Sequence, residues 1–351
     1  MRKSCVFFIA LLVLAAVFTP RAFRRPQTKE TEETKHAVTL TIDVIPAADV
    51  GSGSRAAWLR ARAEAFEKTH ENVYIRVRTL KRDQAARLYS EEDGSTGNIA
   101  AYSSGGFADD ERFLSLGSIE RDELIDTLLE SGSETAAAYM YGGYVLLTDA
   151  SVKEDADIED EIRFMRVAIC CETDECGAAA LAMSGLSPKE TEILPRGEAN
   201  AMFSARTCDA LVASHYTAYR FWNLARQGKA EPVTILPLGG GFADQVHYVS
   251  VVPSMPRQDE AALAFVEYLL SKDAQETLEN IGMFSVLSSV RRERGGEEGS
   301  LLSRLFECEQ ETAQCPNVFL WQMQRQTAQE LAADVLRGGA RAPLQNLLIT
   351  P

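Results

Sequence analysis

Alternating apolar and polar residues predict a strand, a helix and a second strand at the start of the folded part of the chain. Residues 38–44 carry an apolar side chain at every second position, which is typical of a half-buried strand. Ser54 is a good N-cap for a helix over 55–69, and a second alternating run covers 73–77. Strands joined by a helix-length crossover form parallel pairs, so we expect an α/β sheet.

A second stretch, residues 244–288, predicts a strand, two helices and a returning strand. Its first part is rich in β-branched and aromatic residues, and Pro256 then stands where a helix with regularly spaced apolar positions can begin. A shorter helix over 271–280 ends at Gly282, and the apolar run 283–287 follows. We expect the chain to cross between two halves here, pack a helix and cross back.

The remaining periodic segments extend the α/β pattern. Strand-forming runs lie at 98–102, 139–148, 163–171 and 233–237, and helical spacing occurs at 177–183 and 209–226. In open α/β sheets, ligands bind outside the carboxyl ends of the strands, which directs attention to the loops that contain Asp49 and Ser103. Tyr102 ends one such strand, and the alternative to a ligand-contacting ring is a half-buried tyrosine beside a turn.

Length and charge narrow the class of protein. A chain of 351 residues exceeds what one hydrophobic core usually supports, so two lobes are expected. The formal net charge of -15 argues against binding nucleic acid through its phosphates. Apolar residues make up 46% of the chain, which is ordinary for a globular protein and argues against disorder.

The N-terminus is typical of an export signal. Arg2 and Lys3 precede an uninterrupted apolar run over 5–18, which is short for a helix that spans a membrane. Residues 1–25 are therefore predicted to be a signal peptide or, because the cleavage site is poor, an uncleaved membrane anchor. Residues 26–36 are polar and read as a linker, so the folded part is expected to be exported and extracytoplasmic.

Motifs of catalysis and of cofactor or metal binding are not found in the sequence. It contains no Gly-x-Ser-x-Gly elbow and no His-Glu-x-x-His pair, and the glycines at 239–241 are followed by a predicted strand rather than by a helix. The cysteine spacing matches no standard zinc site, and Cys308 with Cys315 is the most local disulfide pairing. We expect no enzyme, cofactor or metal, although a carboxylate pair of a secreted hydrolase stays open among 51 acidic residues.

Several segments resemble a known family. Residues 260–286, EAALAFVEYLLSKDAQETLENIGMFSV, are similar to the helix that lies between two hinge crossings in extracellular solute-binding proteins of ABC importers, of the maltose-binding type (family 1). Phe66-Glu67-Lys68, the glycine before Ala201-Met202, and Val233 to Pro237 resemble further parts of that family. The resemblance implies a two-lobed, type II periplasmic-binding-protein-like fold, in which helices flank a mostly parallel sheet in each lobe.

The resemblance also implies how the lobes are divided and what they do. Lobe 1 is expected at 37–146 plus 250–284 and lobe 2 at 147–249 plus 285–351, with a hinge of several crossings. The implied function is capture of a small polar solute, expected to be a carbohydrate, by hinge closure, and its delivery to an ABC transporter permease by a monomer. Candidate ligand residues are Asp49, Tyr102, Ser103, Tyr141, Trp222 and Phe242. Candidate hinge residues are Gly142, Gly143, Val249 and Phe284.

Two alternatives accompany this interpretation. The part of lobe 2 between 147 and 197 is short for the family, and Arg206, Thr207 and Cys208 replace the glycine and tryptophan of sugar binders. These departures favour a degenerate, membrane-anchored relative that acts as a sensor or interaction protein, and a secreted hydrolase is the weaker alternative. Trp222 lies at helical spacing with other apolar residues, where aromatic side chains are more often core.

Overall fold

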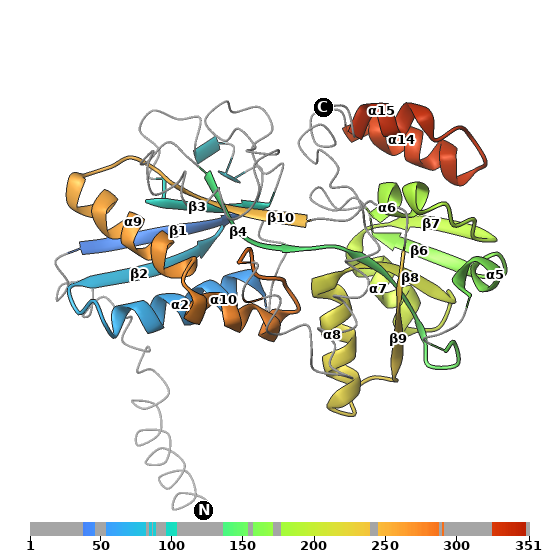
Figure 1. Ribbon diagram of the computed structural model, residues 1–351, viewed down its shortest axis with the longest axis horizontal. Helices are drawn as coiled ribbons and strands as arrows, with labels where there is room; N and C mark the ends of the chain where they lie inside the picture. The colour runs from blue at the N-terminus through green and yellow to red at the C-terminus, as the bar shows by residue number, and fades with distance from the viewer. Residues whose placement is uncertain are drawn as a thin grey trace, which may run out of the picture.

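The fold consists of two five-stranded mixed sheets with helices packed on them (Figure 1). The computed structural model describes residues 38–45, 54–81, 84–85, 87–88, 96–103, 136–153, 157–170, 177–238, 245–287, 290 and 325–348. Residues 1–36, to which the export signal and the linker were assigned, lie outside these ranges, as do Cys308 and Cys315. Within the described ranges, no helix has both the length and the apolar character that crossing a bilayer requires.

The first sheet contains the predicted parallel pair. Its strand order is β2-β1-β3-β10-β4, with β1 parallel to β2 and β3, and β10 antiparallel to β3 and β4. The expected strand, helix, strand opening is confirmed. The strands are β1 Val38–Ile45, β2 Val73–Thr79, β3 Ile99–Ser103, β4 Ala136–Gly142 and β10 Gln245–Val251.

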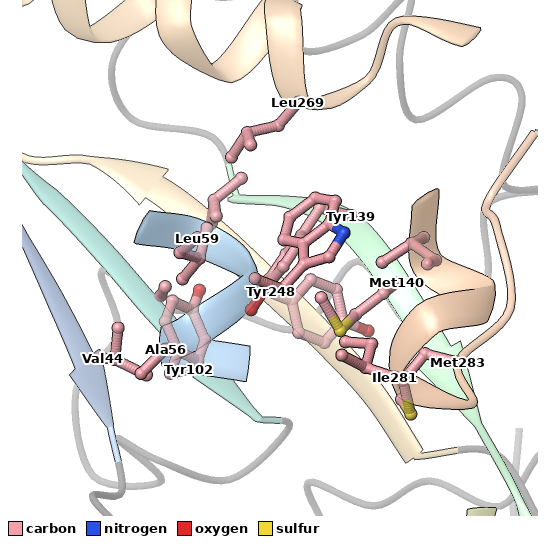
Figure 2. Close-up of a cluster of buried hydrophobic side chains, with 14 of the residues drawn as sticks. Val44, Ala56, Leu59, Tyr102, Tyr139, Met140, Tyr248, Leu269, Ile281 and Met283 are labelled. Carbon is pink, nitrogen blue, oxygen red and sulfur yellow. The ribbon is translucent and has the colours of Figure 1, made fainter. Parts of the chain in front are cut away.

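Helices α2 and α9 cover one face of this sheet. In the core between them, the ring of Phe66 meets that of Phe265 edge to face, with 5.3 Å between ring centroids. Figure 2 shows another part of this core, where Met140, Ile281 and Met283 lie together. Gly282 ends the last helix with a φ of 69°, as the sequence predicted. The helices are α2 Arg55–Glu67, α9 Pro256–Leu269, α10 Lys272–Gln275 and the 3-10 helix η3 Glu276–Ile281.

The second sheet has the order β7-β6-β8-β5-β9, with β6 parallel to β7 and β8, and β5 antiparallel to β8 and β9. The C-terminal helix α14 packs on α6 of this lobe. The strands are β5 Tyr144–Asp149, β6 Arg166–Cys170, β7 Glu190–Leu194, β8 Ala210–Ser214 and β9 Val233–Pro237. The helices are α5 Ile158–Ile162, α6 Gly177–Ser184, α7 Arg196–Ser204, α8 His215–Arg226, α14 Arg325–Leu336 and α15 Ala342–Leu348.

The chain passes between the sheets at places slightly different from those expected. Gly143 alone separates β4 of the first sheet from β5 of the second, so residues 144–146 belong to the second sheet rather than to lobe 1. Residues 245–249 belong to β10 of the first sheet rather than to lobe 2. Both corrections follow from strand pairing, which places each strand with its hydrogen-bonded neighbours.

Two predicted elements are wrong in kind. Residues 209–226 do not form one helix, because their first part is the fully buried strand β8 and only 215–226 is helical. The strand expected at 283–287 is reduced to a single bridge residue at Phe284.

Candidate functional site

The carboxyl ends of the parallel strands in the two lobes are directed toward each other, as the arrows of β2 and β6 show (Figure 1). Helix α2 follows the end of β1, and α8 follows directly after β8. Both helices therefore begin at the edges between the lobes, which is where α/β sheets bind ligands. We take these two helix starts and the strand ends beside them as the candidate site.

On the first lobe, this edge carries a buried pair formed by Arg55 and His247. Arg55 is only 2% exposed and His247 4%. Nη1 of Arg55 donates a hydrogen bond to Nδ1 of His247 at 2.8 Å, since a guanidinium can only donate. His247 is opposite Ser103 at the end of β3, so the pair lies at the carboxyl edge.

The Arg55 and His247 pair carries a net positive charge. Burial and the neighbouring guanidinium hold the pKa of His247 well below its usual value, so its imidazole is neutral and the charge of Arg55 is not reduced. Arg55 also occupies the first turn of α2, which contains no acidic residue. The cation there lies at the positive end of the helix dipole.

On the second lobe, the start of α8 is tied to the crossing between the sheets. The backbone N–H of His215 donates to the carbonyl of Gly143 at 2.9 Å. The His215 ring meets Phe284 edge to face, with 5.2 Å between ring centroids. Nδ1 of His215 is buried without a hydrogen-bond partner, and burial lowers the pKa of this side chain to about 3. His215 is thus a neutral, packed part of the contact between the lobes.

The two helix starts lie close to one another along the edge. A Cβ placed on Gly142 would come within 3.4 Å of Cβ of His215, so α8 touches the end of β4. Gly142 is opposite Gln245, which precedes His247 by two residues on β10, a separation of roughly 7 Å along a strand. A small solute at this edge would therefore meet groups from both lobes.

The predicted ligand residues fall into three groups. The backbones of Ser103 and Tyr141 lie at this edge, opposite His247 and Val246 of β10. Asp49 and Phe242 lie outside the residues that the structure describes.

Two of the predicted ligand residues have core positions. Tyr102 is 3% exposed, its ring stacks on that of Tyr248 at 5.9 Å, and burial raises the pKa of its phenol. Trp222 is half-buried against the core, with the guanidinium carbon of Arg226 4.6 Å from the centre of its ring. The position of Trp222 agrees with its core alternative. Tyr102 is more buried than the half-buried tyrosine of its own alternative, and this burial does not support stacking of its ring on a solute.

The predicted hinge residues differ in whether they lie at a crossing between the two sheets. Gly142 and Gly143 lie at the first crossing, and Phe284 contacts the start of α8. Val249 does not lie at a crossing, because it is opposite Ala101 and Ala137 in the middle of β10. Rotation of the backbone at Val249 would break the ladder on both sides, so this hinge position is wrong.

The sequence reading missed Arg55, His247 and His215 as site residues. Arg55 had one recognisable signal, a basic residue in the first turn of a helix that follows a strand end. Among the described residues, no group of three or more His, Cys, Asp or Glu side chains could hold a metal ion, and Cys208 is a buried free thiol.

Solved structures with similar folds come from several bacteria. An ABC transporter substrate-binding protein from Bradyrhizobium japonicum is 13% identical, with a TM-score of 0.60 over 85% of this chain and 99% of that chain. Maltose-bound MalE3 of T. maritima is 14% identical, with a TM-score of 0.57 over 89% and 98%. The spermidine/putrescine protein PotD of Streptococcus pneumoniae is 14% identical, with a TM-score of 0.55 over 79% and 91%. These likenesses confirm the two-lobed α/β fold.

The comparison with sequence families is more specific. No curated protein sequence matches the chain. The profile of the bacterial extracellular solute-binding proteins matches residues 50–284, a range that contains strands of both sheets and both sides of the candidate site. The resemblance stated from the sequence is therefore confirmed, and the chain belongs to the bacterial extracellular solute-binding proteins.

Proposed function

We propose that this protein captures a small polar solute outside the cytoplasm by closing its two lobes, and delivers it to the permease of an ABC importer. The observation that carries the proposal is the family match, which spans both sheets and the edges that face each other. A carbohydrate is the first class of solute to test, because the sequence resembles the maltose-binding type and one protein of similar fold holds maltose.

The connections between the lobes support a closing movement. Only Gly143 separates β4 from β5, and a second connection lies between the end of β9 and the start of β10. Rotation at these few residues can move one lobe against the other without breaking either sheet. A solute that contacts both edges stabilises the closed form, because only that form provides both sets of contacts.

A ligand screen tests this proposal. The purified protein is heated with sugars, polyols, sugar acids, amino acids and peptides, and its melting temperature is measured by scanning fluorimetry. A true ligand at about a hundred times its Kd adds about 2.7 kcal/mol to the free energy of unfolding, which gives a clear rise in melting temperature.

Closure of the two lobes is measured on the protein with and without the same ligand. Small-angle X-ray scattering should show a smaller radius of gyration with the ligand than without it, and a non-binding stereoisomer is the control. A panel in which no compound raises the melting temperature would contradict the proposal, and binding without compaction would contradict closure.

The proposed function also implies where the protein acts and which protein it contacts. We infer that residues 1–25 direct export and that the folded part acts as a monomer beside the permease. Fractionation of cells should recover the chain outside the cytoplasm, and cross-linking should join it to a permease subunit. Recovery in the cytoplasmic fraction would contradict this placement.

A further inference from the structure

We propose that His215 makes the contact between the two lobes depend on pH, because protonation of its imidazole separates the start of α8 from Gly142 and Phe284. This contact exists in the protein without any solute, so its dependence on pH goes beyond the proposed function. Where a solute is captured, its affinity then varies with the pH outside the cytoplasm, and that consequence alone rests on the proposed function.

The imidazole of His215 lies between the lobes. His215 is the first residue of α8, which packs on β5, β8 and β9 of the second sheet. Its ring meets that of Phe284, and its Cβ lies beside Gly142, the last residue of β4 in the first sheet. Gln275 holds the segment after Phe284 on the first lobe, because its Oε1 accepts from the hydroxyl of Ser285 and from the next backbone N–H. The ring therefore belongs to one lobe and packs against the other.

This environment suits a neutral imidazole and not a charged one. The side chain is 3% exposed, and its buried Nδ1 has no hydrogen-bond partner. A protonated ring carries a charge and an N–H donor on both nitrogens, and burying these without partners is costly. The ring also lies at the start of α8, where the positive end of the helix dipole disfavours a cation. Burial accordingly holds the pKa of His215 at about 3.

The titratable groups around His215 do not offset this cost. Strands β8 and β9 carry none, and the other elements at the contact carry Tyr141 on β4, Tyr144 and Asp149 on β5, Glu276 and Glu279 on η3, and Tyr219 one turn further along α8. Asp149 lies at the far end of β5 from the start of α8 and accepts from the N–H of Ser151. Glu276 pairs with Lys272. None of these groups contributes to the low pKa of His215, for which burial is the only cause.

Separation of the lobes is the less costly way to bring the ring into water. Removing His215 from its own lobe would disrupt β8, whose five residues are all buried. Moving the lobes apart at this contact keeps both sheets intact, because Gly143 alone joins β4 to β5 and can absorb the rotation. Acid is therefore expected to act on the arrangement of the lobes before it acts on the fold.

The direction of the effect follows from where the proton binds. Above the ordinary pKa of 6.5, the imidazole is neutral whether the lobes are in contact at His215 or separated there. Below it, the separated arrangement binds the proton and the contacting arrangement does not. The ratio of separated to contacting molecules therefore rises as the pH falls, by at most about tenfold per pH unit and by about thirtyfold between about pH 7.5 and about pH 5.

Small-angle X-ray scattering of the solute-free protein tests the proposal. Profiles at about pH 7.5 and about pH 5 are fitted to two arrangements of the lobes, and circular dichroism checks the secondary structure at both values. We expect the ratio to rise about thirtyfold in the wild type and less than about twofold in His215→Gln, which is uncharged at either pH. His215→Asn, also uncharged, takes its place if the glutamine variant fails to fold. The control is His70→Asn, at an exposed histidine, which should respond as the wild type does.

Three outcomes would overturn the role of His215. The first is wild-type scattering that is the same at both pH values, and the second is an equal change in the wild type and the uncharged variant. The third is loss of secondary structure at the lower pH in place of a movement of intact lobes. Each of them leaves solute capture intact, because that function is decided by the ligand screen alone.

Discussion

Gln275 connects three parts of the first lobe through one buried amide. Its side chain is 1% exposed, and Nε2 donates to the backbone carbonyls of Tyr139 and Leu269, both at 2.8 Å. Its Oε1 accepts from the hydroxyl of Ser285 and from the N–H of Val286, at 2.8 and 3.0 Å. The amide thus joins β4, the end of α9 and the segment that follows η3.

We predict that Gln275→Leu lowers the free energy of unfolding by about 2–4 kcal/mol, because several buried backbone and hydroxyl groups lose their partner together. Urea denaturation measures the change. The control is Gln258→Leu, which removes one hydrogen bond from a half-buried side chain to the carbonyl of Thr39 and should cost about 1 kcal/mol. Equal losses in the two variants would show that the shared amide has no special role.

Buried His215 should make stability depend on pH. Its pKa in the folded protein is about 3, below its ordinary value of 6.5, so the unfolded chain binds a proton first as the pH falls. The contribution of this residue is therefore complete above about pH 6.5 and is lost between there and about pH 3, with a slope of at most about 1.4 kcal/mol per pH unit.

Unfolding free energies of the wild type and of His215→Gln, measured by urea at about pH 7.5 and at about pH 5, test this dependence. The loss on acidification should be smaller in the variant. The control is His70→Asn, at an exposed histidine, which should lose as much stability as the wild type. A loss in His215→Gln that equals the wild-type loss would contradict the buried, neutral state of His215.

Single residues also show what the alternation of apolar and polar positions cannot predict. Asp43 is on the polar side of an alternating strand, yet it is fully buried and pairs with Arg78 through both carboxylate oxygens, at 2.6 and 2.8 Å. The N–H of Gly97 donates to the same carboxylate. Alternation reports which face a residue is on, but it does not report that both faces of a sheet are covered.

At the scale of elements, Gly282, the residue that ends η3, lies directly against α8. Its φ of 69° is in the left-handed region, and a Cβ there would lie 2.4 Å from Cβ of Tyr219. Gly228, at the end of α8, has a similar φ of 66°, but a Cβ placed on it would meet no atom within 4 Å. The two glycines therefore differ in crowding and not in backbone conformation.

This difference gives a prediction with an internal control. Gly228→Ala should lower the free energy of unfolding by about 1 kcal/mol, the cost of a left-handed alanine. Gly282→Ala should lose about 1–3 kcal/mol more, because η3 and α8 must separate to admit the methyl group. Thermal or urea unfolding of both variants measures the losses. Equal losses would indicate that the contact between η3 and α8 adjusts freely.

The elements were predictable where apolar positions recur with a clear period, even in β1, whose last four residues are all buried. The sequence indicated β1, α2, β2 and α9 correctly, since their apolar positions have a clear period. It failed at β8, where all five residues are buried, because such a strand has no alternation and merges with the helix that follows. Strand β7 was not predicted at all, and its position at the edge of the sheet agrees with its weak apolar content.

For the whole molecule, the two lobes and the family could be predicted, whereas the site could be predicted only in part. Ser103 lies at a strand end and Gly142 and Gly143 lie at a crossing, as expected from the sequence, while their roles in binding and hinge motion stay predictions. The pairing of Arg55 with His247 joins residues 192 positions apart, and no local pattern reports such a contact. Sites between lobes depend on pairings of this kind.

The position of β10 in the first sheet has a consequence for biosynthesis. β10 lies between β3 and β4, although the ribosome makes it only after every strand of the second sheet. A nascent chain that ends before residue 245 has all the described strands of its second sheet, while no strand yet connects β4 to β3, which is paired only with β1. The first sheet is therefore completed late, and the edges of β3 and β4 stay open until β10 has been made.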